Sequence, residues 1–173
     1  WVFGYGSLLW DPGFRPVETV PARLDGWRRS FCMLSIHHRG TEADPGLVLA
    51  LDADEEGRCD GLALRAAPKD AADVLAMLRA RELVSSAYLE RELPLRLADG
   101  RRETALAYVI DPAHRQYCRL DPERQAQMIA RATGGRGPNR DYLFNTARHL
   151  AELGLPDPDL DALVSRVRAI LGG

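Results

Sequence analysis

The sequence has 173 residues, of which 46% are hydrophobic and 28% are charged, and its formal net charge is −2. This composition is typical of a globular domain that buries a core, and it excludes a disordered chain. The small net charge gives no broad basic face, so we expect neither a nucleic-acid partner nor binding to an anionic membrane. We expect a single domain over residues 1–173.

Cysteine content and hydropathy indicate a reducing compartment. The three cysteines (Cys32, Cys59 and Cys118) are an odd number and form no Cys-x-x-Cys pair, so no disulfide framework is expected. No apolar run reaches the ~18 residues of a membrane span, and no secretory signal pattern is present. We therefore expect a cytoplasmic protein. Because the sequence starts at Trp1 inside an apparent strand, we also expect a few residues to precede it.

The first half of the sequence predicts β-strands. Apolar runs predict strands over residues 1–5 and 22–35, the second with a bend at Asp25-Gly26, and a proline-rich loop over residues 11–21 separates them. Residues 47–54 and 59–67 predict a hairpin, with the Glu-Glu-Gly-Arg stretch at 55–58 as its turn.

Helical patterns dominate the rest of the chain. Pro68 and the apolar residues Ala72, Leu75 and Leu78 predict a helix over residues 68–82. Two alternating segments joined through Asp99-Gly100 then predict a second hairpin over residues 87–111. Three more helices are predicted, over residues 121–134, 139–154 and 157–173, the first of which starts at an aspartate cap and stops at Gly134-Gly135. Strands that close on one another, with helices packed outside them, make an α+β fold.

The sequence carries no pattern typical of a metal site or an activated nucleophile. His37 and His38 are adjacent, so on a strand their side chains point to opposite faces, and the other two histidines stand alone. His-Glu-x-x-His and paired-cysteine spacings are absent, so we expect no metal and no cofactor. Ser7 lacks the Gly-x-Ser-x-Gly context of a hydrolase, and Cys32 alternates with apolar neighbours, as a buried strand cysteine does.

The stretch Gly4-Tyr5-Gly6-Ser7 interrupts the first strand with two glycines. Glycine permits a positive φ and a close approach of the main chain to a neighbour. A strand that ends in such a loop can hold a small ligand with its main-chain N–H groups, although a plain turn explains the same pattern. A phosphate loop is not indicated, because neither a Gly-Lys-Ser/Thr motif nor a helix-start signal follows.

Glu82 is the carboxylate that the sequence singles out. Most other acidic residues are explained as helix caps, turns and solvated faces, and Glu90 and Glu92 are expected on one solvated face of the strand that follows the helix. Glu82 ends a predicted helix, where the helix dipole disfavours a negative charge, and the apolar Leu83 and Val84 that follow indicate partial burial. Partial burial would raise the pKa of this carboxyl toward the range of a general base. An ion pair with Arg79 or Arg81 is the alternative that the residues leave open.

Four stretches stand in an order and at separations typical of one known family. They are VFGYGSLLWDPGF from Val2, HHRGTEADPG from His37, RELVSSAY from Arg81 and NRDYLFNTARHLAELG from Asn139. In this combination the sequence resembles the ChaC family of glutathione-specific γ-glutamylcyclotransferases, over residues 2–171. The resemblance implies a small mixed β-barrel-like fold with flanking and C-terminal helices.

The resemblance also implies a site and a reaction. The α-amine of glutathione attacks its own γ-amide carbonyl, which forms 5-oxoproline and releases Cys-Gly, so the nucleophile belongs to the substrate. The loop of Tyr5, Gly6, Ser7 and Leu8 would hold the γ-glutamyl group, and the catalytic glutamate of the family corresponds to Glu82. Holding the glutamyl chain in a ring-like shape is a proximity effect worth ~7 kcal/mol or more.

Two further substrate-binding residues are expected, and two other functions stay open. Tyr88 belongs to the same motif as Glu82, and Arg39 is the basic residue expected near the glycine carboxylate of glutathione, with a solvated surface position as its alternative. Two departures from the family pattern, His37 in place of aspartate and Glu42 in place of proline, bear on the fit of the substrate. The other functions are cyclotransfer on another γ-glutamyl amino acid or amine, and non-catalytic binding by the same fold. The oligomeric state is not indicated.

Overall fold

The computed structural model describes residues 1–172, which form two compact units. The first unit consists of Trp1–Ser30 and Ala50–Arg115, and the second consists of Phe31–Leu49 and the chain from Gln116 onward. The boundaries between the units fall inside two long strands, β2 (Glu18–Ser35) and β3 (Gly46–Arg65). That the whole chain behaves as a single domain stays a prediction.

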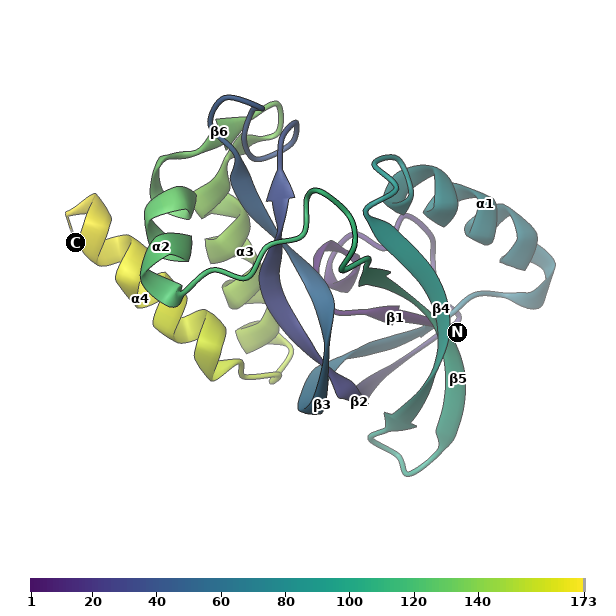
Figure 1. Cartoon of the computed structure of the whole chain (residues 1–173). Helices are drawn as coiled ribbons and strands as arrows, with labels where there is room; N and C mark the ends of the chain where they lie inside the picture. The colour runs from purple at the N-terminus through teal and green to yellow at the C-terminus, as the bar shows by residue number, and fades with distance from the viewer. Residues whose placement is uncertain (173) are drawn as a thin grey trace. The chain divides into compact units, whose positions relative to one another are not determined.

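Five strands form a closed barrel, in the order β1-β3-β2-β4-β5, with a further pairing between β3 and β5 (Figure 1). The remaining strands are β1 (Val2–Gly4), β4 (Tyr88–Leu97) and β5 (Arg102–Ile110). β4 and β5 make the predicted antiparallel hairpin, and Gly100 has a φ of 90° in its turn. The predicted α+β barrel is therefore confirmed.

The barrel encloses the core of the first unit. Because successive side chains on a strand point to opposite faces, Leu95 and Leu97 on β4 alternate inward, as do Ala105, Ala107 and Val109 on β5. All five are at most 4% exposed and belong to one apolar cluster. The interior is thus filled by side chains, as in other small barrels.

The two segments predicted as a hairpin at residues 47–54 and 59–67 form one continuous strand, β3. At its middle the Asp54 carboxylate accepts a hydrogen bond from the N–H of Glu56, and a Cβ on Gly57 would lie 2.8 Å from the Cβ of Asp54. These contacts mark a sharp bend. The hairpin prediction was wrong because both halves of β3 find partners in other strands, so the turn residues bend the strand without ending it.

Helix α1 (Ala71–Glu82) follows a short 3₁₀ turn, η2 (Pro68–Asp70), and ends at the predicted residue. Its buried residues are Val74 and Leu78, one turn apart, whereas Ala72 is exposed. Val74 therefore lies on the buried face of α1 together with Leu78, and Ala72 does not. The end of α1 leads directly toward β4, as Figure 1 shows.

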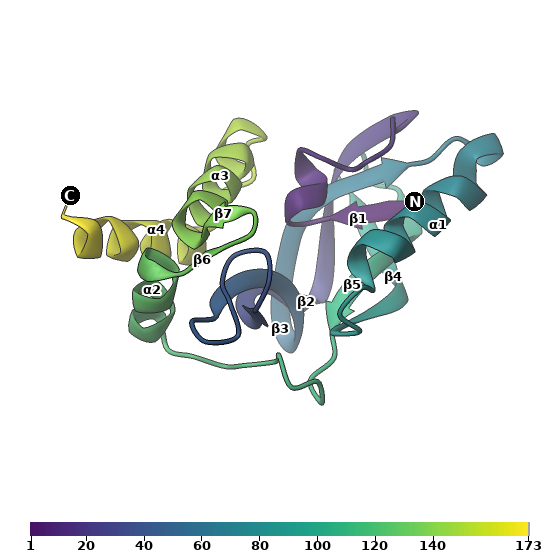
Figure 2. The same cartoon turned by 90° about the horizontal axis from the view of Figure 1, so that it is seen from above.

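The second unit contains three helices that pack on one another, α2 (Pro122–Arg131), α3 (Asn139–Glu152) and α4 (Pro158–Leu171) (Figure 2). The side chains of Asp121 and Asp157 cap α2 and α4 by accepting main-chain hydrogen bonds. No helix within residues 1–172 is long and apolar enough to cross a membrane.

Helix α2 ends at Arg131 rather than at the predicted Gly134. A small hairpin follows it, in which β6 (Thr133–Gly134) pairs with β7 (Gly137–Pro138). A Cβ on Gly134 would lie 2.5 Å from the main-chain nitrogen of Gly40. The glycine is therefore needed for a close approach of two main chains, and it does not stop the helix.

Asn139, at the start of α3, ties this helix to the part of β3 that lies in the second unit. Its side chain is fully buried. Its Oδ1 accepts a hydrogen bond from the N–H of Leu47 (2.6 Å), and its Nδ2 donates one to the carbonyl of the same residue (2.7 Å). The side-chain amide of Asn139 thus makes both main-chain hydrogen bonds of Leu47 that a neighbouring strand would otherwise make.

Candidate active site

The Gly4-Tyr5-Gly6-Ser7 stretch joins β1 to a single 3₁₀ turn, η1 (Ser7–Leu9). The hydrogen bond from the N–H of Leu9 to the Gly6 carbonyl (2.9 Å) closes this turn. Gly6 has a φ of −132°, so the positive φ considered for this loop is not used there. Gly4 instead allows a close approach, because a Cβ there would lie 3.3 Å from the carbonyl carbon of Leu8.

Tyr5 turns its side chain into the barrel. Its hydroxyl donates a hydrogen bond to the main-chain carbonyl of Tyr108 (2.7 Å), and its own carbonyl accepts one from Nε of the buried Arg29 (2.7 Å). The phenol is thus occupied inside the core. A role of Tyr5 toward a ligand would therefore fall to its main chain.

Glu82 is the last residue of α1, and its side chain is only 17% exposed. The predicted partial burial is confirmed. Its Oε1 lies 3.2 Å from Nε of Arg81, so the ion pair considered as an alternative is also present. Arg79, the other candidate partner, pairs with Glu90 instead.

Arg81 connects Glu82 to the η1 loop. Its Nη2 donates a hydrogen bond to Oγ of Ser7 (3.0 Å), and its Nη1 donates one to the carbonyl of Asp11 (2.7 Å). The carboxylate and the serine hydroxyl, which are far apart in the sequence, therefore share one guanidinium.

A second polar cluster lies beside Glu82 on the β4–β5 hairpin. Glu90 stands opposite Tyr108 in the strand register, and its carboxylate accepts a hydrogen bond from the Tyr108 hydroxyl (3.2 Å). Arg79 reaches both oxygens of that carboxylate, at 2.6 Å and 2.9 Å, and these hydrogen bonds hold the pKa of Glu90 below its usual value. Burial, followed by the negative charges of Glu90 and Glu82, raises the pKa of Tyr108. The charge of Glu82 thus acts on this hydroxyl.

Sequence reasoning placed Glu90 and Glu92 together on a solvated face of the strand. That prediction was wrong for Glu90, whose side chain is 20% exposed, and correct for the exposed Glu92. Strand alternation does put both on one face, but it does not show that Arg79 covers the end nearer α1. The observed register pairs Glu90 with Tyr108, whereas counting outward from a two-residue turn at Asp99-Gly100 would have paired it with Val109.

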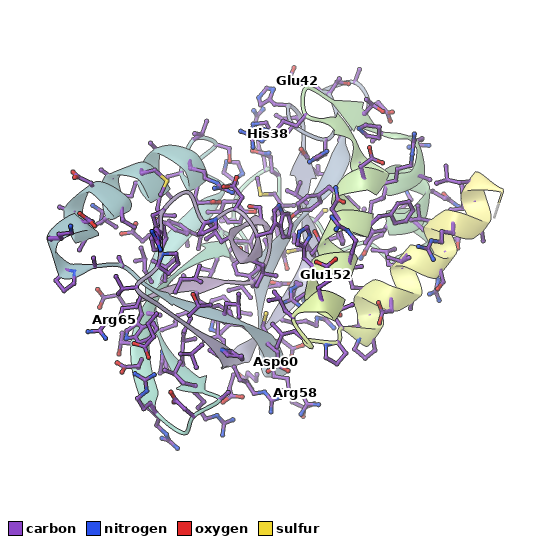
Figure 3. The ribbon with its side chains drawn as sticks, turned by 180° about the vertical axis from the view of Figure 1, so that it is seen from behind. His38, Glu42, Arg58, Asp60, Arg65 and Glu152 are labelled. Carbon is purple, nitrogen blue, oxygen red and sulfur yellow. The ribbon has the colours of Figure 1, made fainter. Side chains whose placement is uncertain are left out.

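The two remaining predicted site residues lie in different units. Tyr88 begins β4 in the first unit, where it is half-buried and pairs with Ile110. Arg39 belongs to the second unit, in the loop between β2 and β3 that also carries His38 and Glu42 (Figure 3).

Arg39 is held within the second unit by several contacts. Its guanidinium lies 5.5 Å from the centre of the Tyr142 ring, and its Nη1 donates a hydrogen bond to the carbonyl of Arg136 (2.6 Å). Burial lowers the pKa of Arg39. Arg39 is therefore a half-buried residue whose guanidinium is held by these contacts, and its role toward a substrate stays a prediction.

The cysteines and histidines add no further site. Cys32 is 1% exposed on β2, as predicted for a buried strand cysteine. Burial raises the pKa of Cys118 to about 11, which keeps this thiol protonated. In the described part of the chain, no three His, Cys, Asp or Glu side chains gather in a way that could hold a metal ion.

Comparison with known proteins identifies the family of this chain. The model of the family described as ChaC-like protein matches residues 1–170. The chain belongs to the ChaC family. This ChaC chain is 38% identical to the glutathione-specific γ-glutamylcyclotransferase of Escherichia coli K12, over 99% of its own length and 74% of the relative's. It is 37% identical to γ-glutamylcyclotransferase 2-3 of Arabidopsis thaliana, over 99% and 89% of the two chains.

The ChaC fold is also seen in a solved structure. The crystal structure of a γ-glutamylcyclotransferase specific to glutathione from yeast superposes with a TM-score of 0.89. The superposed region covers 98% of this ChaC chain and 95% of the yeast chain, and the two sequences are 23% identical. The barrel with its helices is thus the same fold as that of the yeast protein.

Proposed function

We propose that this ChaC protein is a glutathione-specific γ-glutamylcyclotransferase, which converts glutathione to 5-oxoproline and Cys-Gly. The observation that carries the proposal is the guanidinium of Arg81, which lies 3.2 Å from the Glu82 carboxylate and 3.0 Å from Oγ of Ser7. A partly buried carboxylate and a main-chain loop are thereby held together. The names of the relatives in Escherichia coli and Arabidopsis thaliana support the same activity.

The reaction needs a proton carrier and a shaped substrate. The α-amine of the glutamyl group attacks the γ-carbonyl carbon, a C–N bond closes the five-membered lactam, and the amide bond to cysteine breaks. The α-ammonium loses two protons on its way to the lactam N–H, one to solvent before the attack and one to Glu82 as the ring forms, and the departing cysteine nitrogen gains one to leave as an amine. Glu82 takes a proton from the first amine and returns it to the second, so a single carboxylate serves both steps.

The η1 loop holds the γ-glutamyl group. The first N–H groups of a helical turn have no carbonyl partner inside the turn, and here the turn begins at Ser7. The main-chain N–H groups from Tyr5 to Leu8 bind the α-carboxylate or the oxyanion that develops on the γ-carbonyl. Tyr88, half-buried at the start of β4, contacts the substrate beside Glu82.

Arg39 and the compartment complete the proposal. Arg39 recognises the glycine carboxylate of glutathione by its charge, so Arg39→Met should raise the KM for glutathione and leave the KM for γ-glutamylalanine within about threefold. We place the protein in the cytoplasm, because its sequence has an odd number of cysteines and no Cys-x-x-Cys pair, as expected in a reducing compartment.

The test is a 5-oxoproline assay over a panel of γ-glutamyl compounds. Purified protein is incubated with glutathione, γ-glutamylalanine and a γ-glutamylamine, and 5-oxoproline is quantified by mass spectrometry. We expect glutathione to be turned over with the highest kcat/KM. A clear preference for γ-glutamylalanine would reassign the enzyme to another γ-glutamyl substrate. Absence of product from every compound, with glutathione still bound in a calorimeter, would indicate a non-catalytic binder.

A further inference from the structure

Arg81 makes its contacts in two directions at once. Toward its own helix, Nε lies 3.2 Å from Glu82 Oε1. Toward the loop, Nη2 donates to Ser7 Oγ at 3.0 Å and Nη1 donates to the Asp11 carbonyl at 2.7 Å. The side chain of Arg81 is 21% exposed and that of Glu82 is 17% exposed, so their ion pair is largely shielded from water, whereas the hydrogen bond to the Asp11 carbonyl is exposed.

The geometry requires a guanidinium. Arginine presents five donors in a rigid plane, so three acceptors in different directions can be held at fixed mutual positions. A lysine ammonium has the same charge at one point on a flexible stem and cannot replace this arrangement. Each of the three guanidinium nitrogens of Arg81 faces a different group: Nε faces Glu82, Nη2 faces Ser7 and Nη1 faces the Asp11 carbonyl.

Glu82 needs such an anchor because of its place in the fold. It is the final residue of α1, and helix ends leave main-chain groups unpaired and fray. The residues after it include Val84, which is 77% exposed. The segment that follows Glu82 therefore packs little at Val84, and Arg81 is one cation within ion-pair distance of the Glu82 carboxylate.

We infer that Arg81 is a positioning residue, which sets the Glu82 carboxylate in a fixed relation to the η1 loop through the hydroxyl of Ser7. The inference rests on the proposed function, in which Glu82 moves the proton and the loop holds the γ-glutamyl group. The Ser7 oxygen accepts from Arg81, so the one proton of this hydroxyl is left to donate elsewhere. Arg81 itself does not touch the reacting atoms.

A merely structural role for Arg81 predicts a different result. If the guanidinium only ties α1 to the loop, its loss lowers thermal stability and leaves kcat unchanged in the folded protein. If it positions Glu82, its loss lowers kcat in a folded protein, since a misplacement of about 1 Å can cost on the order of 10²-fold in rate. Steady-state kinetics together with Tm separates the two roles.

The experiment compares Arg81→Met, Arg81→Lys, Ser7→Ala and the double variant Arg81→Met/Ser7→Ala. The matched control is Arg91→Met, at an exposed position of β4. We expect kcat with glutathione to fall about 30-fold or more in Arg81→Met and about tenfold in Arg81→Lys, with KM within about threefold. Ser7→Ala should lower kcat less, and it should add nothing in the Arg81→Met background, because the two act through one hydrogen bond.

The outcomes separate this inference from the proposed function. If wild-type protein forms 5-oxoproline and Glu82→Gln does not, but Arg81→Met keeps wild-type kcat, the positioning role is refuted and the function stands. Full kcat in Arg81→Lys would refute it as well, because charge alone would then suffice. If Arg81→Met does not fold, an unchanged kcat in both Ser7→Ala and Arg81→Lys refutes the positioning role in its place. Wild-type protein that forms no 5-oxoproline overturns the function and, with it, the inference.

Discussion

Replacement of Glu82 by glutamine is the most direct test of the proposed chemistry. Glu82→Gln keeps the length and the hydrogen-bonding reach of the side chain but removes its ability to carry a proton between two amines. The side chain is 17% exposed, and Arg81 lies 3.2 Å away. The substitution removes the charge of the ion pair but leaves the hydrogen bonds of Arg81 to Ser7 and Asp11, so we expect α1 and the η1 loop to keep their places.

The structure sets the size of the competing effect. Two unit charges at this distance attract by about 5 kcal/mol at an effective dielectric constant of ~20. Water around the partly exposed groups and the entropy of two long side chains reduce such pairs to about 1 kcal/mol or less. A pure ion-pair role therefore predicts a Tm decrease of roughly 2–4 °C and little change in turnover.

A general acid/base role predicts a much larger effect on the rate. Loss of such a group costs about 10²–10⁴-fold, equivalent to about 2.7–5.5 kcal/mol of activation free energy. The loss should appear in kcat, with KM comparatively unchanged. Because the ion-pair role predicts little change in turnover, the two roles differ by about 2.7 kcal/mol or more in activation free energy.

The assay follows 5-oxoproline formation from glutathione at saturating substrate, with circular dichroism as the check on folding. Glu92→Gln is the matched control, because Glu92 is exposed on β4 and should keep full activity. Glu90→Gln is not a control, since Glu90 binds Arg79 and Tyr108. A folded Glu82→Gln protein with near wild-type kcat would refute the mechanism.

The remaining predictions concern the loop, metal ions and stability. Gly6→Val should raise the KM for glutathione by about tenfold or more, because a branched side chain blocks the approach of the substrate to the main chain. Ser7→Ala should affect this KM less. Equal KM values for Gly6→Val and wild type would show that the loop is not part of the site. Turnover should survive exhaustive chelation, because the proposed chemistry needs only the substrate amine and a carboxylate; activity lost in chelator and restored by a divalent ion would contradict it. Ser86 has a φ of 55°, so Ser86→Gly should raise Tm by about 2 °C in a thermal melt, and a lower Tm would show that the residue is not strained. Asn139→Ala should lower the free energy of unfolding by about 2–5 kcal/mol in urea, because it breaks both hydrogen bonds to β3. Asn145→Ala, at an exposed position, is the control. Equal urea midpoints for the two variants would contradict the argument.

Local signals predicted most of the fold. The turn at Asp99-Gly100 and the aspartate cap of α2 act within a few residues, so the sequence pattern contains all that determines them. The end of α2 and the shape of β3 depend on partners elsewhere in the chain. Gly134 is a glycine because Gly40 passes against it, and no local pattern carries that information.

The candidate site divides in the same way. The sequence predicted the partial burial of Glu82, but Val84, one of the two apolar residues that indicated it, is 77% exposed, so the burial does not come from that residue. The choice of Arg81 over Arg79 as its partner depends on Ser7, which is 74 positions away in the sequence. Glu90 was assigned to solvent because alternation gives the face of a strand but not what covers that face.

These errors lie where the candidate chemistry lies, at the ends of elements. Glu82 ends α1, Ser7 starts the turn after β1, and Glu90 and Tyr108 pair near the open end of the β4–β5 hairpin. Ends of elements carry main-chain groups without internal partners, which is why a ligand can be held there. They are also where sequence patterns are least defined, because the periodicity that identifies a helix or strand stops there. Long side chains such as that of Arg81 bridge these ends, so a search for site residues should begin with cations next to a helix-terminal carboxylate.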